Sequence, residues 1–274
     1  MGGQDWCSIR GDYPAALGSM YRWQVEQLQR FDPVAVLPVG AIEQHGDHLP
    51  LDVDAFLVTE IAAAANEIAR KSICSILVPP IHVGYSAHHM GYCGTVSLSI
   101  ETLIGVVRDT VQSLAHHGFR RVVLLNGHGG NTALLSLVAS ELRSRRVVPL
   151  VLAVDYWNLI VDVIEQVRET ETGGMGHAGE FETSLMMHLR PASVASGFLK
   201  RSVPKPRMLY DSLDLVRKGP FTMPWLVDQD TPSGVVGDPT SATAEKGHLL
   251  FDAATTRVAD LIQEMQQLEL TVAE

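Results

Sequence analysis

Short apolar runs alternate with longer amphipathic segments between about residue 30 and residue 190. Four runs are apolar throughout, which is typical of strands that are buried on both faces of a sheet. Three longer segments repeat apolar residues at three- and four-residue steps, the spacing of a helix with one buried face. The predicted strands are Val34–Val39, Ile76–Val78, Val122–Leu125 and Leu150–Val154, and the predicted helices are Ala55–Lys71, Glu101–His117 and Thr132–Arg146.

The order of these elements predicts the fold class. Strands that alternate with helices form a mostly parallel sheet with helices on both faces, a three-layer α/β/α arrangement. From Gly173 onward Pro, Ser and Gly become frequent and the pattern loosens, until a final helix over about Ala242–Leu268. We therefore expect one domain over residues 1–274, with a core at about 30–190 and covering loops plus the closing helix at about 191–274.

Composition narrows the class of protein. With 46% hydrophobic and 19% charged residues, the chain has the composition of a compact soluble enzyme. A net charge of -10 argues against nucleic acid or an anionic membrane as a partner, because both bind basic surfaces. No apolar run approaches the roughly eighteen residues of a membrane span. The three cysteines form no CxxC pair and the N-terminus lacks a signal-peptide pattern, so we expect the protein in the cytoplasm.

Polar residues follow three of the predicted strands at the point where each strand ends. The stretch GAIEQHGDHLPLDVD (Gly40–Asp54) follows the first strand. NGHGGN (Asn126–Asn131) and DYWN (Asp155–Asn158) follow two others. Because open parallel sheets bind ligands beyond the carboxyl ends of their strands, we expect these three segments to converge on one site.

The side chains of these segments suit a metal ion. Glu43 and His45 are two residues apart, so in an extended segment both point to the same side. Asp54 lies at the start of a predicted helix, and His128 lies in a glycine-rich turn. Imidazoles and carboxylates without thiolates suit Zn, Mn or Fe in a catalytic site.

A further segment, GHAGEFETS, adds candidate ligands at the start of another helix. They are His177, Glu180 and Glu182. The number of candidate side chains then exceeds the three of a single catalytic site, which predicts two divalent ions that share a carboxylate.

Simpler explanations exist for single residues. Asp54 alone would be a helix N-cap. The GHGGN loop alone would be a weak phosphate-binding loop, although its spacing matches neither GxxxxGK[ST] nor GxGxxG. His88, His89 and His116 have contexts typical of surface or hydrogen-bonded histidines. One shared site explains the main set together, whereas the separate explanations must all hold at once.

Four stretches together resemble the creatininase family of metal-dependent amidohydrolases. They are LPVGAIEQHGDHLPLDVD, GTVSLS, RRVVLLNGHGGN and HAGEFETSLM, in order from about Val34 to His188, with a weaker similarity at GDPTSATAEKG. The resemblance implies a creatininase-like fold. Carried over by position, it also implies that a set of residues are metal ligands, with Asp54 between two ions, and that His177 is the acid–base histidine. The implied ligands are Glu43, His45, Asp54 and His128.

The chain departs from creatininase at two places. In the turn after the metal-binding histidine, creatininase has Tyr-x-Asn with a ligand Glu at x, whereas this chain has Gly129 and Gly130. We expect Glu182 to supply the missing carboxylate, with Glu180 as the second candidate or as a proton-handling catalytic group. Creatininase also has a Trp-Asp pair and a Glu that contact creatinine. This chain has glycines at those positions, so creatinine is not the expected substrate here. The residues at those positions are Gly173, Gly174 and Gly176.

The resemblance also implies the reaction. We expect a metal-dependent hydrolase that cleaves a C–N bond of a small amide, either a cyclic amide (lactam) or a formamide, with a hydroxide between the two ions as nucleophile. Similar family members form hexamers, so we expect a homo-oligomer. Two other functions are compatible with the residues: a Rossmann-like nucleotide-binding enzyme that uses NGHGGN, and a metal-binding protein without activity. The candidate substrate contacts are Tyr85, His88, His89, Gly129 and Trp157.

Overall fold

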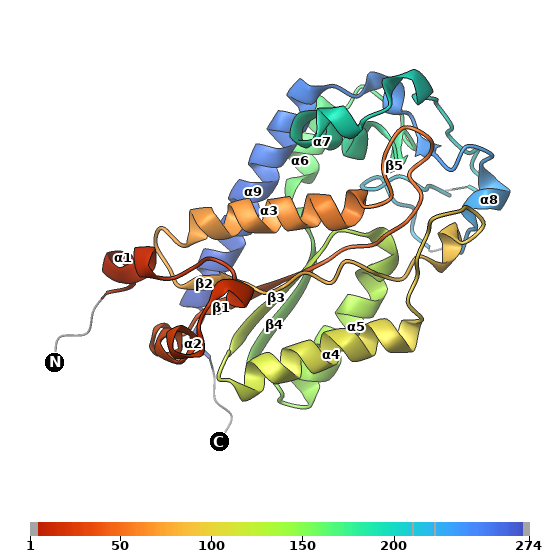
Figure 1. The fold of residues 1–274 in the computed structure, drawn as a ribbon. Helices are drawn as coiled ribbons and strands as arrows, with labels where there is room; N and C mark the ends of the chain where they lie inside the picture. Colours follow the sequence, from red (N-terminus) through yellow and green to blue (C-terminus); the bar gives the residue numbers. More distant parts are fainter. Residues whose placement is uncertain (1–4, 210, 222, 271–274) are drawn as a thin grey trace.

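The structure is a computed structural model that describes residues 5–209, 211–221 and 223–270. Its centre is a parallel sheet of four strands in the order β2–β1–β3–β4 (Figure 1). These strands are β1 (Val34–Val39), β2 (Ser75–Leu77), β3 (Arg121–Asn126) and β4 (Leu150–Asp155). A separate antiparallel pair consists of β5 (Met175–His177) and β6 (Val236–Gly237).

Helices cover both faces of the sheet. The longer helices are α3 (Val53–Ala69), α4 (Ile100–His116), α5 (Thr132–Ser144), α7 (Glu180–Leu189) and α9 (Ala244–Gln267). The shorter ones are α1 (Trp6–Ile9), α2 (Arg22–Leu28), α6 (Val161–Val167) and α8 (Val227–Asp230). Helices α3 and α9 pack against one face and against each other, while α4 and α5 cover the opposite face (Figure 1).

The central strands are buried on both sides. Val34 and Val36 pack into the core beneath α3 and α9, whereas Ala35 and Leu37 pack into the core beneath α4 and α5. Successive strand residues point to opposite faces, so a strand covered on both faces needs apolar residues at every position. This explains why the predicted strands are apolar throughout.

The predicted fold class is confirmed, and the main elements differ from the prediction only at their ends. Strand β1 has the predicted bounds, β3 is one residue longer at each end, and α3 begins and ends two residues earlier than predicted. The predicted helix end at HHG is confirmed, because Gly118 has φ +90°. The sequence pattern did not predict α1, α2, α6, α8 or the β5–β6 pair, which are short. The division of the chain at about residue 190 stays a prediction.

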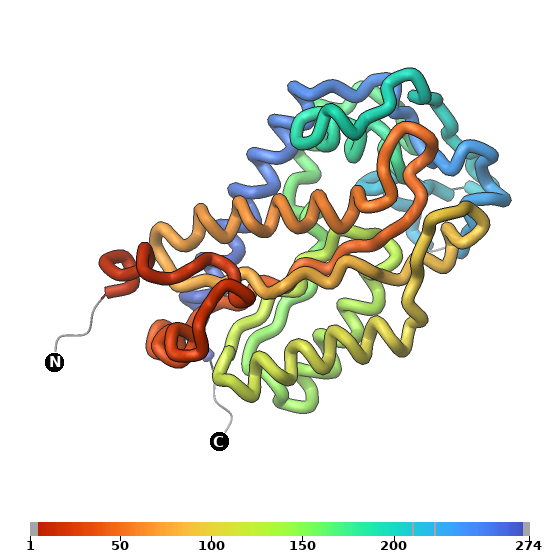
Figure 2. Tube along the Cα trace, in the orientation of Figure 1, coloured from red at the N-terminus to blue at the C-terminus, as the bar shows by residue number. Residues whose placement is uncertain are grey.

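Strands β1, β3 and β4 end side by side. Val39 is in register with Asn126, and Asn126 is in register with Asp155. The segments that follow these strands therefore leave from one edge of the sheet. The β1–α3 segment also pairs with the β2–α4 segment through a bridge between Ile42 and Val96. Both segments lie at the end of the molecule away from α1 and α2 (Figure 2).

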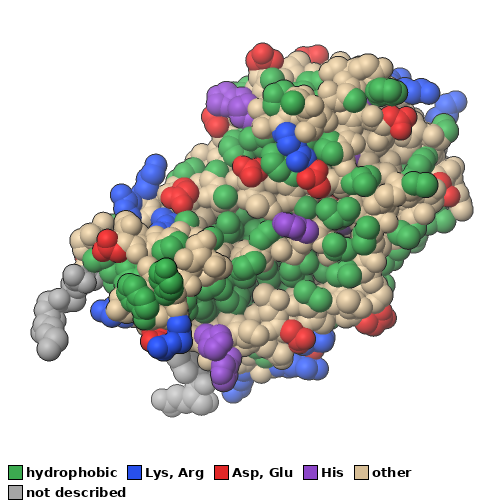
Figure 3. All heavy atoms as spheres, viewed as in Figure 1, with side chains coloured by type: hydrophobic (Ala, Val, Ile, Leu, Met, Phe, Trp, Pro, Cys, Tyr) green, Lys and Arg blue, Asp and Glu red, His purple; other side chains and the backbone are tan. Residues whose placement is uncertain are grey.

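No helix among the described residues is long and apolar enough to cross a membrane. On the face shown in Figure 3, Lys and Arg side chains are scattered among Asp and Glu rather than gathered into a continuous basic surface.

Candidate metal centre

The β1–α3 segment brings three candidate ligands into the interior. It leaves β1 in close contact with helix α3, since a Cβ on Gly40 would lie 2.4 Å from Cα of Ala55. Only glycine allows the two backbones to approach so closely. Glu43, His45 and Asp54 are each at most 2% exposed. The segment is therefore not a solvated loop.

Asp54 lies between two histidines. Its Oδ1 is 3.3 Å from Nε2 of His45, and its Oδ2 is 3.0 Å from Nδ1 of His128. Helix α3 begins at Val53 with Asp52 at the N-cap position, so Asp54 is not the helix cap that its position alone suggested. Its two oxygens face two different partners instead.

The turn after β3 places His128. The side chain of Asn126 accepts a hydrogen bond from the backbone N–H of His128 (3.1 Å) and donates one to its carbonyl oxygen (2.8 Å). This local pair of bonds fixes the turn, as Asn side chains commonly do. The imidazole then lies with Nε2 at 3.3 Å from Oε2 of Glu43.

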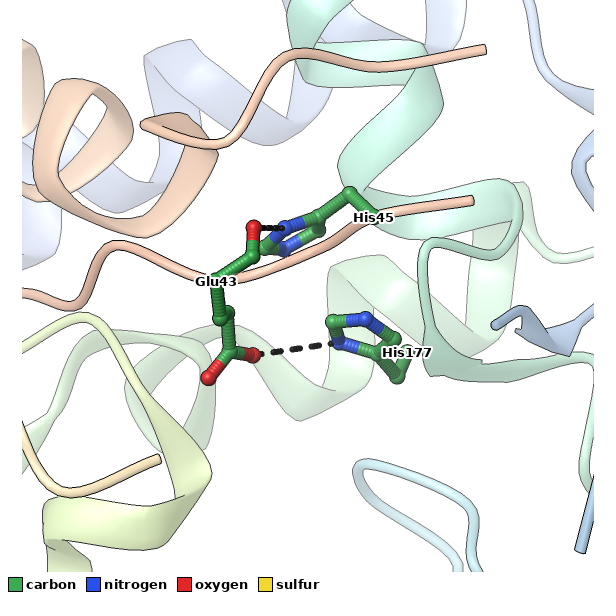
Figure 4. A group of neighbouring side chains, drawn as sticks. All are labelled: Glu43, His45 and His177. Atoms are coloured by element: carbon green, nitrogen blue, oxygen red, sulfur yellow. Dashed lines mark hydrogen bonds and ion pairs between the residues drawn. The ribbon is translucent and has the colours of Figure 1, made fainter. Parts of the chain in front are cut away.

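Strand β5 and the start of α7 supply His177 and Glu182. Between them Ala178 has φ +53°, which is uncommon for a residue with a Cβ. In this turn the N–H of Ala178 donates to Oε2 of Glu182 (2.6 Å), and that oxygen lies 3.9 Å from Nε2 of His45. His177 directs Nδ1 toward Oε1 of Glu43 at 3.4 Å (Figure 4).

Three histidines of the cluster are held in the same way. A carbonyl oxygen only accepts hydrogen bonds, so the ring nitrogen that faces it carries the proton. The three contacts are Nδ1 of His45 to the carbonyl of Glu43 (3.0 Å), Nε2 of His128 to that of Tyr85 (3.0 Å) and Nε2 of His177 to that of Gln44 (2.7 Å). The other nitrogen of each ring faces the carboxylates, which is the usual arrangement of metal-binding histidines.

Within the described part of the chain, three sets of side chains bring their ligand atoms within 4.8 Å of one another. Two of the sets share Asp54, whose two oxygens point in different directions. The sets are Glu43–Asp54–His128, His45–Asp54–Glu182 and Glu43–His45–His177.

These side chains fit a divalent cation. Among the described residues, both carboxylate oxygens of Glu43, Oδ2 of Asp54 and Nε2 of His45 are buried without a hydrogen-bond partner. Buried polar atoms are nearly always hydrogen-bonded, and buried charge without compensation is costly. Oxygen and imidazole donors without thiolates are suited to Zn or Mn. Cations bound to the two sets that share Asp54 would satisfy these atoms.

The electrostatics of the cluster also favour positive charge. Burial raises the pKa of Glu43 and that of Glu182, each to about 7. Burial alone would lower the pKa of His45, but the Asp54 carboxylate outweighs it and the pKa rises to about 10. Burial alone would lower the pKa of His128, but the Glu43 and Asp54 carboxylates outweigh it and the pKa rises to about 9. The carboxylates thus draw protons onto the histidines, and a divalent cation would supply the same positive charge.

Glu180 does not join the cluster. Its carboxylate accepts hydrogen bonds from Nζ of Lys246 (2.6 Å), from Oγ1 of Thr170 (2.6 Å) and from backbone N–H groups of Glu169 and Thr170. The side chain is fully buried, and its partners lie on α9 and on the segment before β5. The structure therefore places Glu182, and not Glu180, beside the other candidate ligands.

The candidate substrate contacts lie at different distances from the cluster. Nε2 of His89 is 3.2 Å from Oε1 of Glu43, and the His88 ring stacks on His128 with centroids 5.7 Å apart. Trp157 is buried in the core beneath α3 and α9 and packs edge-on against Tyr156. The remaining two are Tyr85, which contacts His128 through its carbonyl, and Gly129, which is exposed.

The sequence pattern did not identify two residues that contact members of the site. Gln44 donates to His89, and Lys246 binds Glu180. Glu43 and His45 were identified because they are two residues apart. Gln44 lies between them, so that spacing left it out. Lys246 lies in GDPTSATAEKG, where the sequence gives no sign of a partner on another helix.

Comparisons with known proteins find relatives that match most of the chain. A family model described as creatininase (creatinine amidohydrolase) matches residues 19–262. Creatinine amidohydrolase from Pseudomonas putida is 34% identical over 247 residues, which are 85% of this chain and 90% of that protein. The mycofactocin precursor peptide peptidase of Mycobacterium ulcerans (strain Agy99) is 32% identical over 252 residues, 89% of this chain and 91% of that protein.

Two solved structures are similar over nearly the whole chain. One is described as creatininase Mn and the other as a mutant creatininase of Zn–Zn type. Each is 30% identical and covers 93% of this chain and 100% of its own, with TM-scores of 0.76 and 0.78 respectively.

Proposed function

This chain belongs to the creatininase family, and from that premise we propose that it hydrolyses a C–N bond of a small amide at two divalent metal ions. Membership makes the chain a metal-dependent hydrolase. The observation that carries the two-ion proposal is that Asp54 faces two sets of ligand atoms. One ion would be held by Glu43, Asp54 and His128, and the other by His45, Asp54 and Glu182.

Zn or Mn would suit these ligands. The donor set consists of carboxylate oxygens and imidazole nitrogens, which both ions accept. The similar structures described as Mn and Zn–Zn forms support the same pair of ions. When bound, such ions would lower the pKa of a coordinated water and polarise the carbonyl group of an amide.

His177 would handle the proton of the reaction. Its Nε2–H is held by the carbonyl of Gln44, so Nδ1 is the nitrogen that faces the cluster. Burial keeps the pKa of His177 well below its ordinary value, so the ring is neutral before the reaction, with a lone pair at Nδ1 that would take a proton from the attacking water. The same atom would then deliver a proton to the departing amide nitrogen, since each C–N cleavage requires one. A positioned transfer of this kind contributes about 10²- to 10⁴-fold in rate.

Creatinine is not the substrate that we propose. The glycines that stand where creatininase contacts creatinine have no room for side chains. A Cβ on Gly174 would lie 2.3 Å from Cβ of Thr170, and one on Gly176 would lie 2.3 Å from the carbonyl oxygen of Val236. A relative named as a peptide peptidase indicates that similar chains act on amides other than creatinine. We propose a cyclic amide or a formamide as substrate.

We also propose that the protein is a homo-oligomer. Several large apolar side chains near the site end of the molecule are exposed, and a subunit interface would bury them. They include Leu51 (38%), Met90 (57%), Val96 (52%) and Phe198 (63%).

The proposed activity can be tested with a substrate panel. Protein freed of metal with a chelator and then reloaded with Zn²⁺ or Mn²⁺ should be assayed against cyclic amides, formamides, lactones and creatinine. We expect turnover of at least one amide, only after reloading, and little turnover of creatinine. A metal-independent activity, or creatinine as the best substrate, would contradict the proposal.

A further inference from the structure

A fourth histidine, His89, lies as close to the cluster as His45, His128 and His177 do. His89 is 1% exposed, and its Nε2 lies 3.2 Å from Oε1 of Glu43. The corresponding distance from Nε2 of His128, a candidate ligand, to Oε2 of Glu43 is 3.3 Å. Distance alone therefore does not separate His89 from a metal ligand. The difference lies in the partner of its second ring nitrogen, which is a side-chain amide and not a carbonyl.

The orientation of the Gln44 amide is fixed by two backbone groups. Its Oε1 accepts from the N–H of Gly46 (3.0 Å), and its Nε2 donates to the carbonyl oxygen of Gly234 (2.9 Å). A backbone N–H can only donate and a backbone carbonyl can only accept, so the reversed amide would lose both bonds. The amide nitrogen of Gln44 is thus the atom that faces His89.

This orientation decides where the proton of His89 resides. One hydrogen of the Gln44 amide goes to Gly234, and the other points to Nδ1 of His89 at 2.8 Å. Nε2 of His177 is also 3.2 Å from the amide nitrogen, but it carries a proton directed to the carbonyl of Gln44 and so does not accept. A ring nitrogen that accepts a hydrogen bond carries no proton, so the proton of the neutral ring resides on Nε2. Nε2 of His89 then has no lone pair for a metal ion. The Nε2–H group of His89 lies beside Oε1 of Glu43.

We propose that Gln44 is a positioning residue that keeps His89 as an N–H donor beside Glu43 and thereby excludes it from the metal ligands. The inference rests on the proposed metal role of Glu43. A ligand carboxylate is commonly oriented by a partner outside the ligand set, and loss of such partners typically costs about 10- to 100-fold in metal affinity or activity. His89 would supply this partner electrostatically, because its Nε2–H lies 3.2 Å from Oε1 of Glu43 without the alignment of a hydrogen bond, and Gln44 selects the tautomer that allows it.

The amide is held firmly enough to act in this way. Gln44 is 5% exposed, and its backbone N–H donates to Oγ1 of Thr95 (3.1 Å). Gly234 has φ +75°, and a Cβ there would lie 2.0 Å from Oε1 of Gln44. Gly234 itself is anchored because its N–H donates to the hydroxyl of Tyr92 (3.1 Å). The side chain therefore lies between two anchored segments and cannot rotate without breaking these contacts.

Substitution Gln44→Glu reverses the polarity of this contact at nearly constant shape. A carboxylate accepts where the amide donated, so His89 should place its proton on Nδ1 and turn a lone pair of Nε2 toward Glu43. Protein labelled with ¹⁵N-histidine distinguishes the two tautomers directly by ring-nitrogen chemical shifts in the metal-free state. We expect an Nε2–H tautomer for His89 in the wild type and an Nδ1–H tautomer in Gln44→Glu. The absorption spectrum of the Co²⁺-loaded variant should also differ from that of the Co²⁺-loaded wild type, because the environment of Glu43 changes.

Asn66→Asp is the matched control. Asn66 is fully buried on α3, twelve residues after Asp54 and thus about 18 Å along the helix. This variant also introduces a buried carboxylate for an amide, and it should leave the His89 tautomer and the Co²⁺ spectrum unchanged. If Gln44→Glu does not fold, Gln44→Met removes the donor and should leave His89 in a mixture of both tautomers.

An Nδ1–H tautomer of His89 in the wild type would overturn the inference, as would an unchanged tautomer or Co²⁺ spectrum in Gln44→Glu. Failure of the wild type to bind Co²⁺ would instead contradict the proposed function, and the tautomer of the metal-free protein would then decide the inference alone.

Discussion

Nζ of Lys246 lies 2.6 Å from Oε1 of Glu180, so the first glutamate of GHAGEFETS is bound to helix α9 and not to the cluster of candidate ligands. The Lys246 side chain is 10% exposed and that of Glu180 is fully buried. The ion pair joins α9 to the start of α7, the helix that carries Glu182. It also holds the segment before β5, through the bonds of Glu180 to Thr170. Glu180 thus supports the candidate ligands from outside the cluster.

Substitution Glu180→Gln should lower stability without removing metal. Removing one partner of a buried ion pair leaves an uncompensated charge, which costs about 3–5 kcal/mol. We expect a loss near the lower figure, because Glu169 also lies 3.0 Å from Lys246 and is exposed. Urea unfolding measures the change, and elemental analysis should show an unchanged metal content. The double variant Glu180→Leu with Lys246→Met should recover part of the stability, and loss of metal from Glu180→Gln would show that the glutamate is a ligand.

His177→Ala should lower kcat on the best amide substrate by about 10²- to 10⁴-fold, the usual contribution of a positioned proton transfer. The metal content should stay the same, because both ligand sets around Asp54 lack this histidine. His177 also belongs to a third candidate set with Glu43 and His45. If His177→Ala loses an ion, that set is the metal site and the acid–base role is wrong.

The two glycines after His128 should respond differently to the same substitution. A Cβ on Gly130 would lie 2.4 Å from Nε2 of His128 and 2.4 Å from the carbonyl oxygen of Tyr85, whereas no atom lies within 4 Å of a Cβ on Gly129. Overpacking of this kind typically costs about 1–3 kcal/mol, so Gly130→Ala should lower the melting temperature and the affinity for Zn²⁺. Gly129→Ala should change stability by no more than about 0.5 kcal/mol. Equal effects of the two substitutions would contradict the geometry of this turn.

Acid should weaken the fold through Asp214. Burial alone would raise the pKa of Asp214, but hydrogen bonds from Arg168 (2.7 and 3.0 Å) and from the N–H of Gly173 (2.7 Å) outweigh it and hold the pKa below its ordinary value. A pKa that is lower in the folded state means that the stabilisation is complete above the unfolded pKa of about 4 and is lost as the pH falls through the folded pKa. The difference in unfolding free energy between wild type and Asp214→Asn should therefore be largest near neutral pH and shrink in acid.

Asp162→Asn is the control for this pH dependence. Asp162 pairs with Arg257 at the surface, where its side chain is 56% exposed. Exposed pairs contribute little, so this variant should follow the wild type across the pH range. A constant difference between wild type and Asp214→Asn from neutral pH to pH 2 would contradict the account of Asp214.

The edge of the sheet at which the site lies could be predicted from the sequence, because the order of strands and helices fixes it. Parallel strands present their carboxyl ends together, and Val39, Asn126 and Asp155 do end in register. The apolar strands and the polar residues after them were visible without a structure. That order places the segments carrying Glu43, Asp54 and His128 at one edge, whereas the meeting of their side chains is seen only in the structure.

The choice between Glu180 and Glu182 could not be made from the sequence. Successive residues of a helix are rotated by about 100° about its axis. Glu180 and Glu182 are two residues apart in α7, so their side chains point in very different directions. Which one faces the cluster depends on where the helix begins and on Lys246, a partner 66 residues away in the sequence. Neither the first residue of the helix nor this distant partner can be read from the local sequence pattern.

The role of Gln44 was hidden for a related reason. Its hydrogen-bond partners come from separate loops, at Gly46, His89 and Gly234. Irregular segments have no periodicity from which a side chain's direction can be read, so only the folded chain shows which atoms meet.

The most direct test of the central claim is the number of divalent ions bound per chain. Purified protein reloaded with Zn²⁺ should bind two ions in the wild type, one in Glu182→Gln and none tightly in Asp54→Ala, because Asp54 belongs to both ligand sets. Elemental analysis with a parallel calorimetric titration gives these numbers. A wild type that binds no Zn²⁺, or an Asp54→Ala variant that still holds two ions, would contradict the account.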